Sequence, residues 1–118
     1  MPLRNAILAD VPHMVQLADR RGLPPSAPDE YAHRLTTLLE QPDSIAVVNE
    51  EEGRVTGFLL ASVVAVPSAT SSEAVCMIEE VLVDEDREGA LQHTLVLEVF
   101  RQAAVRGVTQ VVIAAQGM

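Results

Sequence analysis

The sequence contains few of the residues on which several classes of protein depend. Cys76 is the one cysteine among 118 residues, so no disulfide can form within the chain, and a single thiol with apolar neighbours is typical of a small core residue. Lys and Arg together number 8 against 17 Asp and Glu, which gives a net charge of −9. Nucleic acid binding requires a face rich in Lys and Arg, so this balance argues against it and fits a cationic or amine partner better.

Long apolar stretches are also absent from the sequence. No run approaches the roughly 18 apolar residues of a membrane-spanning helix, and Met1 opens no signal-peptide pattern. We therefore expect a soluble, cytoplasmic protein that does not bind membranes. The sequence has no internal repeat, low-complexity tract or interdomain linker, so residues 1–118 are expected to form a single domain around one core.

The first third of the chain predicts one short strand and two helices. Residues 3–7 are a strand candidate, and Asp10 can cap a helix whose apolar residues follow the helical period until Gly22. A second helix is expected to begin near Pro28, because Tyr31 and the leucines that follow it form one apolar stripe at helical spacing.

The middle of the chain predicts strands. Residues 44–49 and 55–66 are rich in Val, Ile and Leu and flank an acidic turn at residues 50–53, which predicts an antiparallel hairpin. A polar loop at residues 67–73 then leads to a further strand at residues 74–83.

The last third of the chain is the most informative. An acidic loop, DEDREG, follows the strand AVCMIEEVLV and precedes a long helix with Leu91, Leu95 and Val99 on its apolar face. Gly107 suits the left-handed C-terminal cap of that helix, and the segment TQVVIAA, residues 109–114 at its core, predicts a last strand.

This order of strands and helices resembles the GNAT (GCN5-related N-acetyltransferase) superfamily over essentially the whole chain. The resemblance implies an α/β (α+β) fold with a mixed, largely antiparallel sheet of about five strands and helices on both faces. The family normally adds a helix and two strands after this point, usually with a tyrosine that protonates the departing thiolate. Tyr31 is the only tyrosine here, and it lies in a different segment.

The resemblance also implies where acetyl-CoA would bind. In the family, backbone groups of the central strand, here Val81, Leu82 and Val83, pair with the pantetheine arm. An Arg/Gln-x-x-Gly-x-Gly/Ala loop then receives the pyrophosphate on backbone N–H groups at a helix N-terminus. In the best register this loop reads Arg87, Glu88, Gly89, Ala90, Leu91 and Gln92. The sequence departs from the family at two of these positions, where alanine replaces the first glycine and glutamine replaces Gly or Ala.

The charges of this loop are unusual for a phosphate site. Arg87 is its single cation, and acidic residues surround it at positions 84, 85, 86 and 88. Each like charge would oppose a bound pyrophosphate by up to a few kcal/mol. A side chain at Ala90 would be strained if the backbone there needed a positive φ, and Gln92 adds bulk close to the expected phosphate position.

Glu79 and Glu80 are the candidate catalytic residues. Neighbouring side chains of a strand point to opposite faces, so one carboxylate is expected in the cleft and the other on the opposite layer. The segment MIEEVLV resembles the Ile-Glu-Asp-x-x-Val strand of small-amine acetyltransferases, which implies that an acidic residue orients or deprotonates the amine, with a pKa raised by partial burial. Alternatively, one glutamate is solvated and the other pairs with an arginine such as Arg4 or Arg54.

The sequence therefore leaves two functions from different classes open, with an unrelated α/β domain as a more distant third. The first is a GNAT-type N-acetyltransferase that moves an acetyl group from acetyl-CoA to a small-molecule or peptide amine. The second is a non-catalytic regulatory or assembly module that has lost cofactor binding. The histidines show no metal-ligand spacing, and His93 is expected to be exposed. An unpaired edge at residues 109–114 predicts a homodimer.

Overall fold

The computed structural model describes residues 3–22, 27–67 and 72–113 and contains one five-stranded sheet with helices on both faces. The strands are β1 (Leu3–Asn5), β2 (Ser44–Glu51), β3 (Arg54–Pro67), β4 (Ser72–Val83) and β5 (Val111–Ile113), in this spatial order. The helices are α1 (Val11–Arg20), α2 (Pro28–Glu40) and α3 (Ala90–Val105). The first four strands pair antiparallel and β5 pairs parallel with β4. The predicted fold class is confirmed.

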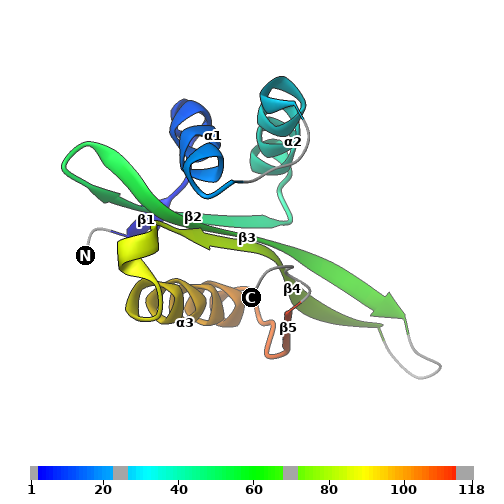
Figure 1. Ribbon diagram of the computed structural model, residues 1–118. Coiled ribbons are helices and arrows are strands. Elements are labelled where there is room, and N and C mark those ends of the chain that lie inside the picture. The colour runs from blue at the N-terminus through cyan, green and yellow to red at the C-terminus, as the bar shows by residue number, and fades with distance from the viewer. Residues whose placement is uncertain (1–2, 23–26, 68–71, 114–118) are drawn as a thin grey trace.

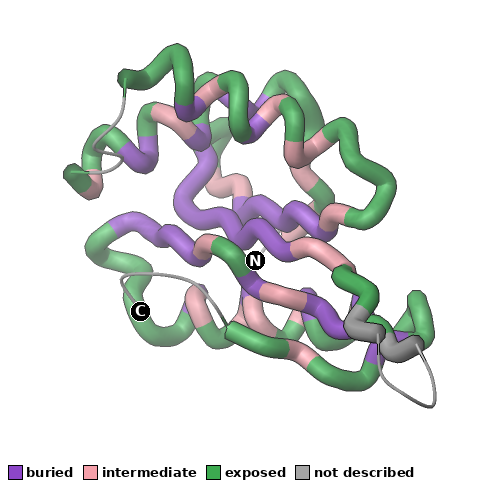
Figure 2. The backbone as a smooth tube through the Cα atoms, turned by 90° about the vertical axis from the view of Figure 1, so that its right-hand side faces the viewer, coloured by how far each residue is buried: buried purple, intermediate pink, exposed green. Residues whose placement is uncertain are grey.

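The sheet separates two apolar clusters, with α1 and α2 over one face and α3 over the other (Figure 1). The buried stretches lie mainly in the central strands, between outer helical surfaces that are exposed (Figure 2). On the α3 side the cluster contains Cys76, as expected of an inert core thiol, and its burial raises the pKa of that thiol. None of the helices in the described ranges is long and apolar enough to span a membrane.

The helices form where the apolar spacing predicted them. In α1, Met14, Leu17 and Ala18 are fully buried, and Gly22 follows with a φ of 76°, as a C-terminal glycine should. Asp10 does occupy the N-cap of α1, but the prediction that its side chain caps the helix is wrong. Its carboxylate instead accepts hydrogen bonds from Arg4 Nη1 at 2.8 Å and from the backbone N–H of Ile7 at 2.8 Å. β1 ends at Asn5, two residues before the predicted limit.

Three strands, β2, β3 and β4, extend further than the sequence predicted. The hairpin turn consists of Glu52 and Gly53 alone, with φ values of 53° and 74°, and such a pair of left-handed residues matches the twist of the flanking strands. Glu51 therefore belongs to β2 rather than to the turn. The predicted loop at residues 67–73 is also too long, because β3 extends to residue 67 and β4 begins at residue 72.

A glycine in β3 allows α3 to lie close to the sheet. A Cβ atom at Gly57 would lie 2.8 Å from Leu91 Cδ2 and 3.0 Å from Val83 Cγ1. Real Cβ atoms rarely approach other atoms so closely, so a larger residue at this strand position would force the neighbouring side chains to shift. The close approach seats the first turn of α3 directly on the sheet, next to the end of β4.

Candidate active site

The candidate site begins at an irregularity in the pairing of β3 with β4. Leu60 pairs with Glu80 and Ala61 pairs with Ile78, so Glu79 is an extra residue in β4. Such a bulge interrupts the alternation of faces along the bulged strand. The core confirms this shift, because Ile78 and Val81, three positions apart, both pack in the cluster on the α3 side.

Because of the bulge, Glu79 and Glu80 border the same cavity, on the α2 side of the sheet. The prediction that the two carboxylates point to opposite layers is therefore wrong. The cavity has a volume of about 590 Å³ and opens to solvent between α2 and the middle of β3 and β4. Its lining is Tyr31, His33, Arg34, Leu35, Thr37, Leu38, Leu60, Glu79 and Glu80.

The two carboxylates differ in their surroundings. Glu80 is half-buried and accepts a hydrogen bond from the hydroxyl of Tyr31 at 2.8 Å. Burial raises the pKa of Glu80, and this effect outweighs the lowering by the Tyr31 hydrogen bond and by Arg34. Glu79 is exposed and accepts a hydrogen bond from Ser62 Oγ at 3.1 Å. Glu80 is thus the carboxylate whose pKa is raised by its environment, a property common in groups that transfer protons.

Neither glutamate pairs with the arginines that the sequence offered as partners. Arg4 forms ion pairs with Asp10 and Glu50, and Arg54 forms one with Asp84. Tyr31 is the contact that sequence reasoning missed, since it lies 49 residues from Glu80 along the chain. A tyrosine within an apolar stripe does carry one signal, because its buried hydroxyl needs a partner.

After the bulge, the described residues leave one side of the β4 backbone without a paired strand. β5 pairs only with residues 76–78 of β4, so within the described ranges no strand lies beside residues 79–83 on that side. The predicted last strand is therefore shorter than residues 109–114, of which residue 114 lies outside the described ranges. The side chains of Val81, Leu82 and Val83 are buried in the two clusters, which leaves their main-chain groups as the part available to a ligand.

The loop after β4 forms the N-terminus of α3. Gly89 has a φ of 87°, so the positive φ falls on the glycine and Ala90 begins the helix without strain. The N–H of Gly89 donates to Gln92 Oε1 at 3.3 Å, and the N–H of Ala90 donates to the carbonyl of Glu88 at 3.2 Å. The N–H groups of Leu91 and Gln92 have no acceptor among the described residues. Of the backbone N–H groups at residues 89–92, two are thus engaged within the protein.

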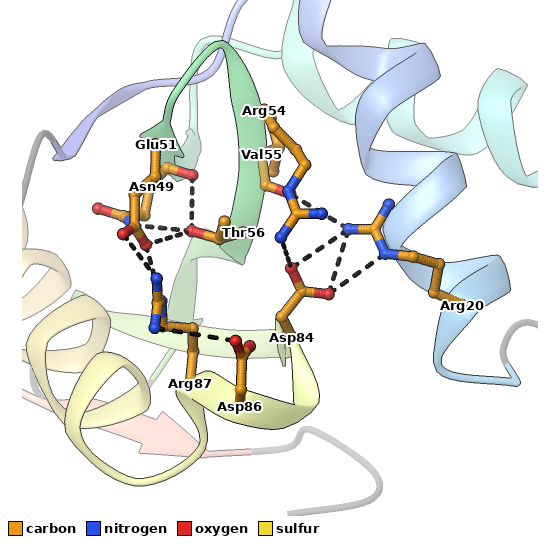
Figure 3. Close-up of polar contacts among 9 residues, drawn as sticks. All are labelled: Arg20, Asn49, Glu51, Arg54, Val55, Thr56, Asp84, Asp86 and Arg87. Carbon is orange, nitrogen blue, oxygen red and sulfur yellow. Dashed lines mark hydrogen bonds and ion pairs between the residues drawn. The ribbon is translucent and has the colours of Figure 1, made fainter.

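Arg87, the cation of the loop, is also engaged. Its Nε and Nη2 each donate to a different oxygen of Glu51, both at 3.0 Å, and Figure 3 shows the guanidinium turned toward β2. Glu51 further accepts hydrogen bonds from Asn49 Nδ2 and Thr56 Oγ1, each at 2.9 Å. The partner of Arg87 is therefore a residue of the β2–β3 hairpin, although Asp86 lies at 3.9 Å.

A second ion-pair group fixes the start of the loop. Asp84 is only 8% exposed and lies between Arg20 and Arg54, at 3.2 Å and 3.3 Å (Figure 3). Arg21 pairs with Glu88. Most of the acidic residues in the loop thus have arginine partners, which reduces the surplus negative charge that the sequence alone implied. His93 is exposed on α3, and the described residues contain no group of three His, Cys, Asp or Glu arranged to hold a metal.

Comparison with known proteins identifies the fold. The sequence matches no protein-family model and no curated protein. An aminoglycoside antibiotic 6'-N-acetyltransferase from Acinetobacter haemolyticus has a similar structure, with a TM-score of 0.82 and 17% identity over 99% of this chain and 81% of that one. For a predicted acetyltransferase with acetyl-CoA from Clostridium acetobutylicum the values are 0.80 and 14%, over 98% and 81%. For a transcriptional regulator from Bacillus halodurans they are 0.81 and 16%, over 98% and 82%.

Proposed function

We propose that this protein, which has the fold of the GNAT superfamily, is an N-acetyltransferase that moves an acetyl group from acetyl-CoA to an amine. The observation that supports this proposal is the bulge in β4. It brings two carboxylates to one cavity, and beyond it no strand among the described residues pairs with β4 on the β5 side. An amine site and a free strand edge therefore lie at the same point of the sheet.

The residues of this chain fit one part of acetyl-CoA better than the other. The free edge at Val81, Leu82 and Val83 fits a pantetheine arm, which can pair with it as an added strand. At the loop, the N–H groups of Leu91 and Gln92 are available for a phosphate, whereas those of Gly89 and Ala90 first have to exchange their present acceptors.

Within the cavity, the protein's own task is to orient the amine and accept its proton. Acetyl-CoA would supply an acyl group activated as a thioester. Glu80 or Glu79 holds the ammonium by charge and then takes the proton that the nitrogen must lose before it attacks. Between them, Glu80 is favoured by its partial burial and its raised pKa.

A second candidate function is a non-catalytic module that binds no acetyl-CoA. Specific observations favour it. Arg87 is ion-paired with Glu51, the N–H of Gly89 is hydrogen-bonded to the side chain of Gln92, and the loop contains several acidic residues. In this case the GNAT fold would serve regulation or assembly, and the cavity at Glu80 would have no acyl donor beside it.

Calorimetric titration with acetyl-CoA and with CoA, up to millimolar ligand, distinguishes the two candidates. The transferase should bind both ligands and then acetylate at least one member of a panel of amines. Glu80→Gln should reduce that turnover by roughly 100-fold or more, because a general base is lost. The matched control is Glu98→Gln, which removes a carboxylate from α3 that pairs with Arg101 and lies outside the cavity. Absence of any heat would refute the transferase and support the module. Binding of acetyl-CoA without turnover of any amine would refute both candidates as stated.

A further inference from the structure

The cavity beside the bulge is lined by both charged and apolar side chains. Glu79 and Glu80 of β4 line it together with Arg34 and His33 of α2. Leu35 and Leu60, which are buried, and the half-buried Leu38 form apolar wall. Small-molecule sites commonly combine such an apolar wall with a few fixed polar groups.

Tyr31 fixes one of the two carboxylates. Its side chain is only 2% exposed, and its hydroxyl donates to Glu80 Oε1 at 2.8 Å. A packed tyrosine ring has little freedom to move, so this bond holds the carboxylate in one orientation. The other oxygen, Oε2, has no hydrogen-bond donor among the described residues. One oxygen of Glu80 is thus held by α2 and the second is free for a ligand in the cavity.

The polar and charged groups around Glu80 come from two elements. α2 contributes Tyr31, Arg34 and the rim residue His33, β4 contributes Glu79, and β3 contributes only the apolar Leu60. The Arg34 guanidinium lies 5.4 Å from the centre of the Tyr31 ring, within the range of a cation–π contact. The Tyr31 hydrogen bond lowers the pKa of Glu80 against the larger effect of burial, and so it keeps more of this carboxylate ionised.

We propose that the cavity takes a primary amine attached to an apolar group, that the ammonium binds Glu80 rather than Glu79, and that Tyr31 positions Glu80 for this contact. The ion pair is stronger at Glu80 because that carboxylate is half-buried, whereas water screens the exposed Glu79. The leucine wall takes the apolar group. This inference rests on the proposed function for its chemical consequence, and it assigns the substrate class and the roles of the two glutamates.

The test uses phenethylamine as the probe and 2-phenylethanol as its uncharged analogue, without acetyl-CoA. Carbon-detected NMR of the glutamate carboxyls follows Glu80 through a pH titration and through addition of each probe. We expect phenethylamine, but not the alcohol, to shift the Glu80 signal. In Tyr31→Phe the titration midpoint of Glu80 should move to higher pH, because the lost donor favoured the ionised form, and amine binding should weaken roughly threefold to tenfold.

The matched control is Thr36→Val, which also removes one hydroxyl from α2 but whose bond is to the carbonyl of Ala32. This variant should leave both the midpoint and the binding unchanged. If Tyr31→Phe does not fold, the shift of the wild-type Glu80 signal on amine binding still decides between the glutamates, together with Glu79→Gln and Glu80→Gln.

The inference is overturned if phenethylamine perturbs Glu79 alone, if Glu79→Gln abolishes binding while Glu80→Gln preserves it, or if a folded Tyr31→Phe leaves the Glu80 midpoint unmoved. Amine binding through Glu80, without turnover in the presence of acetyl-CoA, would instead refute the proposed transferase activity and leave this assignment standing. Turnover that does not depend on Glu80 would refute this assignment and leave the proposed transferase activity standing.

Discussion

Replacing Gly57 by alanine should destabilise the protein, although alanine loses less conformational entropy than glycine on folding. The added Cβ would lie 2.8 Å from Leu91 Cδ2, 3.0 Å from Val83 Cγ1 and 3.4 Å from Leu95 Cδ1. The end of a leucine side chain can move, but Val83 is β-branched and stiff at χ1, so the strand contact cannot relax as easily. The strain therefore remains mainly at the contact between β3 and β4.

The magnitude follows from two opposing effects. Overpacking a filled core costs about 1–3 kcal/mol, and the reduced freedom of the unfolded chain returns about 0.5–1 kcal/mol. We expect a net loss of about 1–2 kcal/mol in the free energy of unfolding, which for a domain of this size lowers Tm by roughly 4–8 °C. Urea unfolding followed by circular dichroism measures the loss directly.

A double-mutant cycle with Leu91→Ala identifies the cause. Leu91→Ala alone should cost about 2–5 kcal/mol, since it empties a fully buried site. In the double variant the new Cβ has space, so the combined loss should fall short of the sum by about 0.5–1 kcal/mol or more. Additive losses, or a Gly57→Ala protein as stable as the wild type, would refute the packing argument.

Three further predictions concern charge and assembly. Glu51→Gln should tighten CoA binding in calorimetry because Arg87 loses its bidentate partner and the site loses a negative charge; unchanged or weaker binding would contradict this. The Arg4 hydrogen bond lowers the pKa of buried Asp10 below 3.8. The stability that this pair contributes is therefore present above pH 3.8 and is lost as the pH falls through the folded pKa. In Asp10→Asn, the urea midpoint of unfolding should fall less steeply as the pH is lowered into this range. The homodimer expected at the β5 edge should show by light scattering at high micromolar concentration and dissociate in Val112→Lys, whereas a wild-type monomer would exclude it.

The sequence predicted the fold because its elements have clear periods. The stripe beginning at Tyr31 predicted α2, and Leu91, Leu95 and Val99 predicted the buried face of α3. These positions depend on local spacing, which the sequence displays. The ends of the elements were less predictable. The Asp10 side chain bonds to Arg4 rather than capping α1, and the tight turn at Glu52 lengthens β2 and β3.

The site was only partly predictable, because its decisive features depend on pairing across the sheet. Both candidate glutamates border a cavity, and their catalytic role stays a prediction. The bulge that brings them there is set by the register against β3, which one strand's sequence does not contain. The only trace was the three-residue step between Ile78 and Val81. Likewise, nothing near Arg87 in the sequence pointed to Glu51, which lies 36 residues away.

Because of the bulge, the candidate site depends on the number of residues in β4 as well as on their types. Glu79 is the one position in β4 that no residue of β3 opposes, so an in-frame loss of its codon would let the two strands pair without interruption while every core side chain keeps its place. A lineage carrying this fold could therefore gain or lose half of its carboxylate pair in a single genetic event, without any substitution in the hydrophobic interior.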